Sequence, residues 1–505
     1  MTETRDPALD DLDLEQTANG DGNGSRWIEN EPPDVEPARS EHRTDSGNAR
    51  RLVALHGDKI RHVGAWGQWL TWDGRRWQRD TKSTVNELAK DVARQILREA
   101  TNHDGDKRRD LIKWGLQSEN ASKIEAMVRM ARSDPRVAID PQQLDADPYL
   151  LNVGNGTINL RTGTRHAHNQ RDLITKIAAV DHNVTATAPQ WLQFLDTVLP
   201  DPEVRTFLQR YIGSCCTGDV SEHKLVFAFG IGANGKSTLL NAVAHILGDY
   251  AGQAAPDLLM RRRDEPHPTG LADLQGRRLV LATETAQNRH LDEALVKRLT
   301  GGDRIKARHM YADFFEFEPT HKFIVATNHR PEVEGTDHGI WRRIRLVPFD
   351  VVIDDADQDR DLEQKLVAEA PGILNWAIAG CEEWQSKGLT EPAAITNATA
   401  EYRAAMDVIG DFISDCCVLA GGVHAKAADL FKTYGQWCES MGETAVSQRA
   451  FGLKLRERGL TKTTSGVVWW DGIALKAVGR DGEEEGAGPW DPNARRESAA
   501  QRLDF

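Results

Sequence analysis

A short segment near the middle of the chain constrains the fold more than any other feature. A continuous apolar run at 225–229, LVFAF, is followed by the glycine-rich segment GIGANGKST at 230–238, and apolar residues then recur at helical spacing up to 246. An uninterrupted apolar run is typical of a strand buried on both faces. A strand, a loop of the pattern GxxxxGKS and a helix, in this order, predict a phosphate-binding loop in an α/β domain.

The residue types in this loop suit the phosphates of a nucleotide. Glycines let backbone N–H groups converge on phosphate oxygens, and the start of the following helix adds its dipole. We expect Lys236 to reach the β- and γ-phosphates and the hydroxyl of Ser237 to ligate Mg²⁺. The predicted nucleotide-binding residues are Gly230, Ile231, Gly232, Ala233, Asn234, Gly235, Lys236, Ser237 and Thr238.

An acidic residue follows the next strongly apolar run. Residues 278–283 read RLVLAT, and Glu284 comes directly after them. Because the carboxyl end of such a strand faces the phosphates, we expect Glu284 to hold the metal's water and to activate the attacking water. Thr285 stands next, where a second acid would otherwise stand, so a single carboxylate is available there for both tasks.

Two later positions add polar groups to the same predicted site. Asn328 follows the apolar run at 323–327, where an amide can hydrogen-bond the γ-phosphate and orient the lytic water. Arg342 and Arg343 precede the apolar run at 346–349. An arginine there could reach the nucleotide of a neighbouring subunit and stabilise the transition state, although arginines beside a strand are more often a solvated surface.

Between Glu284 and Asn328 lies an insertion in which apolar and basic residues alternate, at 300–311 and 314–319. Alternation predicts a β-hairpin, here with a cationic tip that could hold phosphates in a central pore. The basic residues concerned are Lys306, Arg308 and His309.

The segments on either side of this block read as two smaller units. Residues 51–200 combine short strands around an Asp-Gly turn at 73–74 with helical periodicity at 83–132, which predicts an α+β domain. Residues 401–479 combine two helices with a hairpin, which suggests a winged helix. Its second helix carries a basic face that either contacts DNA phosphates or is a solvated face. The residues of that face are Arg449, Lys454, Arg456 and Arg458.

The net charge of -14 argues at first against a nucleic-acid partner. However, residues 1–50 hold 13 acidic and 5 basic side chains, and residues 480–505 hold 7 acidic and 4 basic ones. Both segments lack large apolar residues in number, so we predict that they are disordered. The remainder is close to neutral, and its net charge does not exclude DNA. No stretch approaches the length of a membrane span, and we expect no membrane partner.

The order of five segments carries a family resemblance. GANGKST, RLVLATE, LTGGDRIKARHMY, HKFIVATNHRP and GIWRRIRLVPF follow one another over about 120 residues. This order resembles superfamily 3 DNA helicases, and more narrowly the primase–helicases of phages and plasmids that are related to the poxvirus enzyme. The resemblance extends from about Arg51 to Lys476.

The resemblance implies an AAA+-like P-loop ATPase core at 201–400, with ATP and Mg²⁺ as cofactors. In that family Lys236 and Ser237 correspond to the Walker A pair, Glu284 to the Walker B acid and Asn328 to sensor 1. Arg343 is the preferred arginine finger, with Arg342 as the second candidate. Lys306, Arg308 and His309 fall in the motif of the hairpin that grips DNA in the pore of a ring, usually a hexamer.

The leading hypothesis is an ATP-dependent DNA helicase at a phage, prophage or plasmid replication fork in the bacterial cytoplasm. Its expected partners are single-stranded and forked DNA, further copies of the chain, and a separate primase and other replication proteins. Only about 100 ordered residues precede Tyr149, so we expect no primer synthesis by this chain. The alternatives are an ATP-switched initiator or loader that binds origin duplex DNA, and a packaging or remodelling ATPase.

Overall fold

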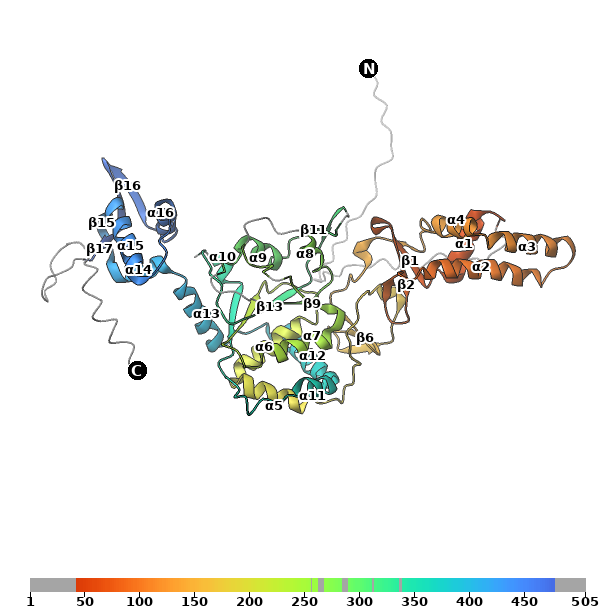
Figure 1. Cartoon of the computed structure of the whole chain (residues 1–505), viewed down its shortest axis with the longest axis horizontal. Coiled ribbons are helices and arrows are strands. Elements are labelled where there is room, and N and C mark those ends of the chain that lie inside the picture. Colours follow the sequence, from red (N-terminus) through yellow and green to blue (C-terminus); the bar gives the residue numbers. More distant parts are fainter. Residues whose placement is uncertain are drawn as a thin grey trace, which may run out of the picture.

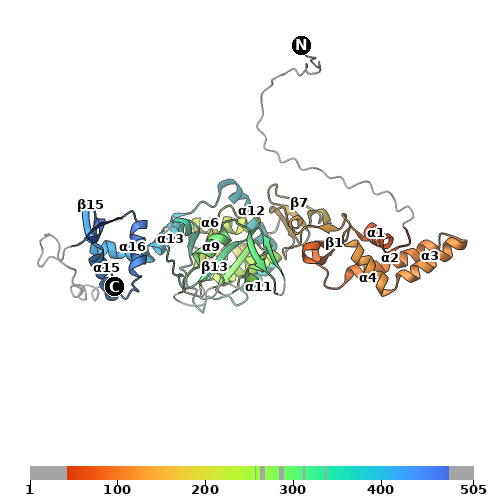
Figure 2. The ribbon, with the colours of Figure 1, turned by 90° about the horizontal axis from the view of Figure 1, so that it is seen from above.

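The computed structural model describes residues 42–255, 257–261, 268–283, 289–310, 313–335 and 338–476. The described chain forms three regions in a row: helices and a small sheet at one end, a central sheet, and a compact unit at the other end (Figures 1 and 2). Most of the predicted disordered segment 1–50 and all of the segment 480–505 lie outside these residues. None of the described helices is long and apolar enough to cross a membrane.

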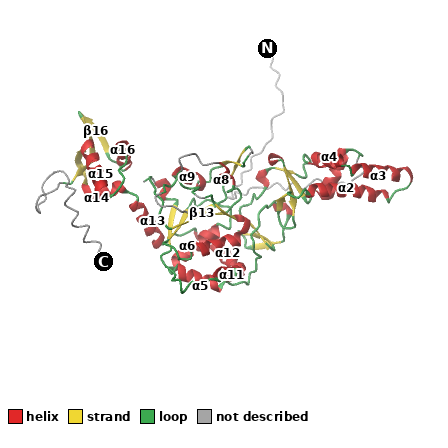
Figure 3. Cartoon of the chain, viewed as in Figure 1, coloured by secondary structure: helices red, strands yellow, loops and turns green. Residues whose placement is uncertain are grey.

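The N-terminal region combines helices with a small sheet (Figure 3). The sheet has the strand order β3-β2-β1-β4. The predicted Asp-Gly hairpin is confirmed, since β2 and β3 pair with Trp72 opposite Trp77. Trp77 is fully buried, as is usual for a core tryptophan. The elements are α1 (Asp45–His56), β1 (Ile60–Val63), β2 (Gln68–Trp72), β3 (Trp77–Arg79), α2 (Thr84–Ala100), α3 (Gly105–Ser118), α4 (Ala121–Ala131) and β4 (Ala138–Ile139).

Helix α1 corrects the prediction that the whole of 1–50 is disordered. It starts at Asp45, and the side chain of Thr44 caps it by accepting a hydrogen bond from the N–H of Gly47. Asn48 is buried and donates to the hydroxyl of Ser118 at 2.9 Å. Composition alone missed this helix because a buried hydrogen bond, rather than a large apolar side chain, holds its first turns.

A three-stranded sheet and two helices link the first region to the centre. Residues of β5, β6 and α5 share one hydrophobic core with the central sheet, although they lie before the domain boundary predicted at 200. The elements are β5 (Leu150–Val153), β6 (Gly156–Asn159), β7 (Thr164–His166), α5 (Pro189–Val198) and α6 (Pro202–Ser214). Short 3-10 turns lie at Gly64–Trp66, Pro141–Gln143, Gln170–Asp172 and Gly248–Tyr250.

The central sheet is parallel, with five strands in the order β14-β8-β13-β10-β9. Along β8, Val226 and Ala228 face one hydrophobic core whereas Leu225 and Phe227 face the other, which confirms a strand buried on both faces. The strands are β8 (Leu225–Phe229), β9 (Ala251–Gln253), β10 (Leu279–Thr283), β13 (Lys322–Thr327) and β14 (Ile344–Pro348). The helices are α7 (Lys236–Leu247), α8 (Pro268–Ala272), α9 (Glu293–Thr300), α10 (His338–Trp341), α11 (Leu362–Ala368), α12 (Ala370–Lys387) and α13 (Ala393–Ala405).

The predicted insertion is a β-hairpin, as the alternation indicated. Strands β11 (Ile305–Arg308) and β12 (Phe314–Phe317) pair antiparallel, with Lys306 opposite Glu316 and Arg308 opposite Phe314. The hairpin lies between α9 and β13 in the chain, and α8 packs against β11. Ile305 and Ala307 point into the core, so Lys306 and Arg308 lie on the other face.

The C-terminal unit follows α13 and has its own core, which includes Phe412, Tyr434 and Phe451. Its three-stranded antiparallel sheet has the order β15-β17-β16, with two helices between its first and second strands. The elements are α14 (Val408–Cys416), β15 (Cys417–Lys426), α15 (Ala427–Met441), α16 (Gln448–Glu457), β16 (Thr461–Ser465) and β17 (Val467–Leu475).

Candidate active site

The glycine-rich loop leaves the carboxyl end of β8 and enters α7 at Lys236. Two of its glycines are required by the local geometry. A Cβ atom on Gly230 would lie 2.2 Å from the carbonyl oxygen of Phe349. Gly235 has φ of 76°, and its Cβ would lie 2.6 Å from Cγ1 of Val198. The loop is therefore packed closely between β14 and α5, and larger residues at these two positions would displace it.

The ammonium group of Lys236 is turned into its own loop. Its Nζ donates to the carbonyl oxygen of Gly230 at 2.7 Å and to Oδ1 of Asn234 at 2.9 Å. The amide of Asn234 in turn donates to the carbonyl oxygen of Phe349 at 3.1 Å. Burial lowers the pKa of Lys236 below its ordinary value. The lysine is thus held by neutral acceptors, and a phosphate would offer it a charged one.

The start of α7 fits a magnesium-bound nucleotide. Ser237 is exposed in the first turn of the helix, where its hydroxyl can act as a hard oxygen ligand. Gly232, Ala233 and Gly235 all have positive φ, a backbone geometry that turns N–H groups toward a common point. Gly232 faces open space, since a Cβ there would meet no atom within 4 Å.

The neighbouring strands bring the other predicted groups to the same edge of the sheet. β13 lies between β8 and β10, with Thr327 opposite Phe229 and Ala326 opposite Thr283. Asn328 therefore follows a strand adjacent to the glycine-rich loop, and it is exposed. β10 ends at Thr283, and Glu284, the predicted Walker B acid, lies outside the described residues.

The structure separates the two candidate arginine fingers. Arg343 is buried, donating from Nε to the hydroxyl of Thr300 at 3.0 Å and from Nη1 to the carbonyl oxygen of Gly339 at 2.6 Å. Arg342 is exposed. In this structure the guanidinium of Arg343 is engaged inside its own chain, whereas Arg342 is directed to solvent; the choice of the finger stays a prediction.

The three hairpin residues lie together around two aromatic rings. Lys306 Nζ lies 5.1 Å and Arg308 Cζ 4.9 Å from the ring centroid of Phe314, which is 52% exposed. The ring of His309 stacks on Phe315 with centroids 5.1 Å apart. The sequence reasoning missed Phe314, although the alternation of the hairpin placed it opposite Arg308. Two cations beside an exposed ring form a surface suited to a base and its phosphate.

The basic face of α16 is only partly available. Arg449 and Arg456 are exposed and Lys454 is half-buried. Arg458 forms an ion pair with Asp407 and donates to the carbonyl oxygen of Lys454 at 3.1 Å. Arg458 thus attaches α16 to the start of α14, so its guanidinium is engaged within the chain; its assignment to a DNA-binding surface stays a prediction.

A further residue near the glycine-rich loop was not predicted as a site residue. The guanidinium of Arg330 lies 4.7 Å from the ring centroid of Phe229, the last residue of β8, and 5.9 Å from that of Tyr402. Arg330 comes two residues after Asn328 and was visible in the segment HKFIVATNHRP, so its place in that motif was the available signal.

A parallel sheet of this order, with a GxxxxGKS loop after β8 and a polar residue after the adjacent strand, is the arrangement of an α/β protein with a P-loop-like core. Three family models match parts of the chain, and two of them agree with the predicted resemblance. Residues 49–200 match the family described as D5 N terminal like, and residues 404–462 match poxvirus D5 protein-like. Residues 228–343 match a family of unknown function. The resemblance to the poxvirus-type primase–helicases is thereby confirmed.

The chain is also similar to proteins of large DNA viruses. It is 26% identical to a "Putative helicase" of Acanthamoeba polyphaga mimivirus, over 74% of this chain and 43% of that protein. It is 29% identical to a "Putative primase" of African swine fever virus, over 45% of this chain and 24% of that protein. A "Putative helicase" of Frog virus 3 is 24% identical, over 57% and 31% of the two chains. The chain spans less than half the length of these relatives.

Among solved structures, the apo structure of the NrS-1 C-terminal region is similar with a TM-score of 0.45 and 10% identity. The match covers 85% of this chain and 99% of that one.

Proposed function

We propose that the chain is an ATP-dependent DNA helicase that moves along single-stranded DNA as a ring. The observation that carries the proposal is that one parallel sheet supports two elements. The Lys236 loop follows β8, and the hairpin with Lys306, Arg308 and Phe314 lies in the chain between β10 and β13. Nucleotide chemistry at the edge of the sheet can thus be coupled to a DNA-gripping element. The names of the viral relatives support the same class of activity.

In this proposal ATP binds with Mg²⁺ at the glycine-rich loop. Lys236 leaves Gly230 and Asn234 for the β- and γ-phosphates, and Ser237 ligates the metal. Asn328 orients the attacking water, and Glu284 remains our candidate for the carboxylate that activates it. The exposed Arg342 replaces Arg343 as our candidate finger toward the neighbouring subunit.

We further propose that the C-terminal unit is a winged helix. Its order of helix, strand, two helices and a two-stranded wing supports this assignment. Arg449 and Arg456 on α16 are its candidates for duplex phosphates. The relatives come from viruses of eukaryotes, so the phage, prophage or plasmid setting and the bacterial cytoplasm stay predictions.

The test is the ATPase rate of the full chain with and without single-stranded DNA, paired with unwinding of a forked duplex. Lys236→Ala removes the only cation of the loop and should lower the DNA-stimulated rate by about 100-fold or more. Lys107→Ala, at an exposed lysine of α3, is the matched control and should leave both activities unchanged. Unwinding by the Lys236→Ala protein at the normal rate would overturn the proposal.

The initiator or loader alternative gives a different result in the same assay. It would bind duplex DNA with sequence preference, and single-stranded DNA would not stimulate its ATPase. Template-dependent incorporation of nucleotides by the purified chain would contradict the prediction that it makes no primers.

A further inference from the structure

A hollow of about 320 Å³ lies where the N-terminal region meets the central sheet. Four basic side chains from separate parts of the chain line it: Arg79 at the end of β3, Lys176 before α5, Arg277 before β10 and His309 beyond β11. Asp273 also lines it. The charged side chains that line the hollow are therefore mainly cations, and they are remote in sequence from the glycine-rich loop.

Asp273 lines the hollow and Asp145 lies near Lys176, but within the part of the chain that the structure describes neither pairs with its cations. Among the described residues, no carboxylate oxygen lies within 4.0 Å of the charged nitrogens of Arg79, Lys176 or Arg277. Burial is the main cause that lowers the pKa of Lys176, the nearby charges of Arg277 and Arg79 add to it, and Asp145 opposes it. Such a concentration of like charges is unfavourable unless an anion joins it.

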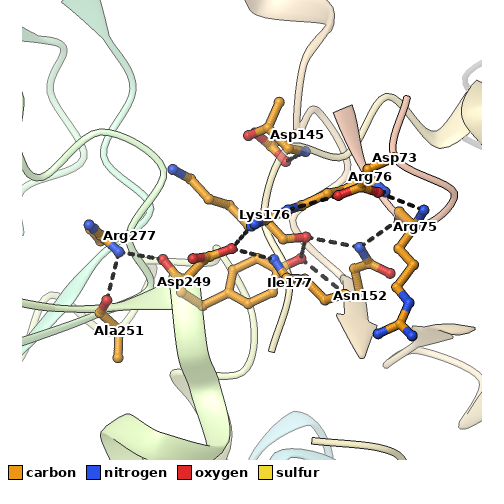
Figure 4. A network of polar contacts seen from close by, with 12 residues as sticks. Asp73, Arg75, Arg76, Asp145, Asn152, Lys176, Ile177, Asp249, Ala251 and Arg277 are labelled. Carbon is orange, nitrogen blue, oxygen red and sulfur yellow. Dashed lines mark hydrogen bonds and ion pairs between the residues drawn. The ribbon is translucent and has the colours of Figure 1, made fainter. Parts of the chain in front are cut away.

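The walls of the hollow are held in place by hydrogen bonds and an ion pair (Figure 4). Arg277 donates from Nη1 to the carbonyl oxygens of Asp249 at 2.6 Å and Ala251 at 2.8 Å. The carboxylate of Asp249 pairs with Arg76 and accepts from the N–H of Ile177 at 3.1 Å. The backbone on either side of Lys176 and the start of β9 are thus fixed to each other, so the cations are already in position for an anion.

The stem of Lys176 lies over a glycine. Gly276 has φ of 71°, and a Cβ atom there would lie 2.9 Å from Cε of Lys176. A larger residue at 276 would push the ammonium group out of its place. The close approach is a second sign that the lysine is held at the hollow rather than extended into solvent.

We infer that this hollow binds a phosphate group, and that the phosphate is part of the backbone of the single-stranded DNA held by the hairpin. His309 both lines the hollow and stacks on Phe315 of the hairpin, so one strand can contact both surfaces. Arginine and lysine nitrogens are the usual donors to DNA phosphates. The inference rests on the proposed function, because it assumes that the chain binds single-stranded DNA. It adds a DNA contact at a site shared with the N-terminal region.

The first experiment measures binding of a labelled oligo-dT to the full chain at several salt concentrations. Arg79→Gln and Lys176→Gln should each weaken binding about 3- to 10-fold and lower the salt slope by about one. Arg75→Gln is the matched control, since Arg75 is exposed in the turn between β2 and β3 and does not line the hollow. Unchanged affinity and slope for both variants would overturn the inference.

A second experiment follows the Lys176 amine directly in the wild-type chain. Its acylation rate is measured by mass spectrometry with no addition, with oligo-dT, with inorganic phosphate and with ATP–Mg²⁺. Protection by oligo-dT at concentrations that saturate binding, without protection by the two small anions, supports a backbone phosphate. Protection by inorganic phosphate or ATP alone overturns the DNA source, and no protection by any of them overturns the site.

Failure of this inference differs from failure of the proposed function. If the wild-type chain does not bind oligo-dT at all, the helicase proposal itself fails. If the wild type binds and Lys306→Gln weakens binding whereas Arg79→Gln and Lys176→Gln do not, only the phosphate site fails.

Discussion

The glycine-rich loop and the hairpin with its adjoining hollow both present cations, but they hold them in opposite ways. In the loop, Lys236 donates to oxygens of Gly230 and Asn234, so the protein itself supplies acceptors. Around the hairpin, Lys306 and Arg308 lie against the exposed ring of Phe314, and the hollow beside His309 gathers further cations that pair with no described carboxylate. To bind a phosphate, Lys236 must exchange its internal acceptors for the ligand. Lys306 and Arg308 lie on the exposed face of the hairpin and have no such acceptors to leave among the contacts described.

The largest expected effect separates the exposed Arg342 from the buried Arg343. Arg342→Ala should lower the DNA-stimulated ATPase by about 1000-fold with an unchanged unfolding midpoint, because the exposed guanidinium acts on a neighbouring site. Arg343→Ala should instead lower the free energy of unfolding by about 2–3 kcal/mol, since it breaks the buried bonds to Thr300 and Gly339. Steady-state ATPase and urea unfolding separate the two effects.

Assemblies that contain both variant subunits, Arg342→Ala and Lys236→Ala, test the finger more directly. Arg342→Ala subunits keep an intact Lys236, and Lys236→Ala subunits keep an intact Arg342, so mixing the two inactive proteins should restore part of the ATPase. Arg360→Ala, at an exposed arginine outside the proposed site, serves as the control and should be fully active alone. No recovery in the mixture, with assembly shown to occur, would contradict a finger that acts between subunits.

The next effect concerns the hairpin. Phe314→Ala should weaken oligo-dT binding by about 10-fold, because stacking of a base on an aromatic ring contributes about 1–3 kcal/mol. Leu192→Ala removes a similarly exposed apolar side chain from α5 and should not change binding. The measurement is fluorescence anisotropy at fixed salt. Equal affinities for the two variants would show that the ring only supports Lys306 and Arg308.

The same contrast explains what the sequence could and could not predict. The strands β8, β10 and β13 and the hairpin follow from apolar runs and alternation, which are local patterns. The loop around Lys236 is contiguous, so its motif predicted its place between strand and helix. The family resemblance alone favoured Arg343 over Arg342. Which of the two is buried depends on tertiary packing such as that of α10 against α9, and no local pattern reports it.

The hollow lined by Arg79, Lys176, Arg277 and His309 could not be predicted from the sequence for a different reason. These four residues are far apart in the chain and share no motif. They meet because residues 150–200 share a core with the central sheet, while Leu173 of the same segment packs against the sheet of the N-terminal region. The same applies to α1, whose buried Asn48 depends on Ser118 in another helix.

The last prediction uses pH to test a buried basic group, His321, beside the central sheet. His321 precedes β13, is buried beside Phe323, and burial lowers its pKa to about 3. In the unfolded chain the imidazole of His321 binds a proton near its ordinary pKa of 6.5, whereas in the folded chain it binds one only near pH 3. Between these values the unfolded state binds more protons, so stability falls as the pH falls, by up to about 1.4 kcal/mol per pH unit.

His321→Gln removes this titration and should flatten the fall in unfolding free energy between pH 6.5 and pH 4, as measured by urea unfolding. The control, His245→Gln at an exposed histidine of α7, should leave the fall unchanged. If the variant is too unstable to measure, NMR titration of the wild-type imidazole gives the same answer, since the His321 ring should stay neutral down to pH 4. A ring that takes up its proton near pH 6.5 would mean that this end of β13 is open to solvent. In that case the strand that carries Asn328 would be less firmly fixed to the sheet than the loop that carries Lys236.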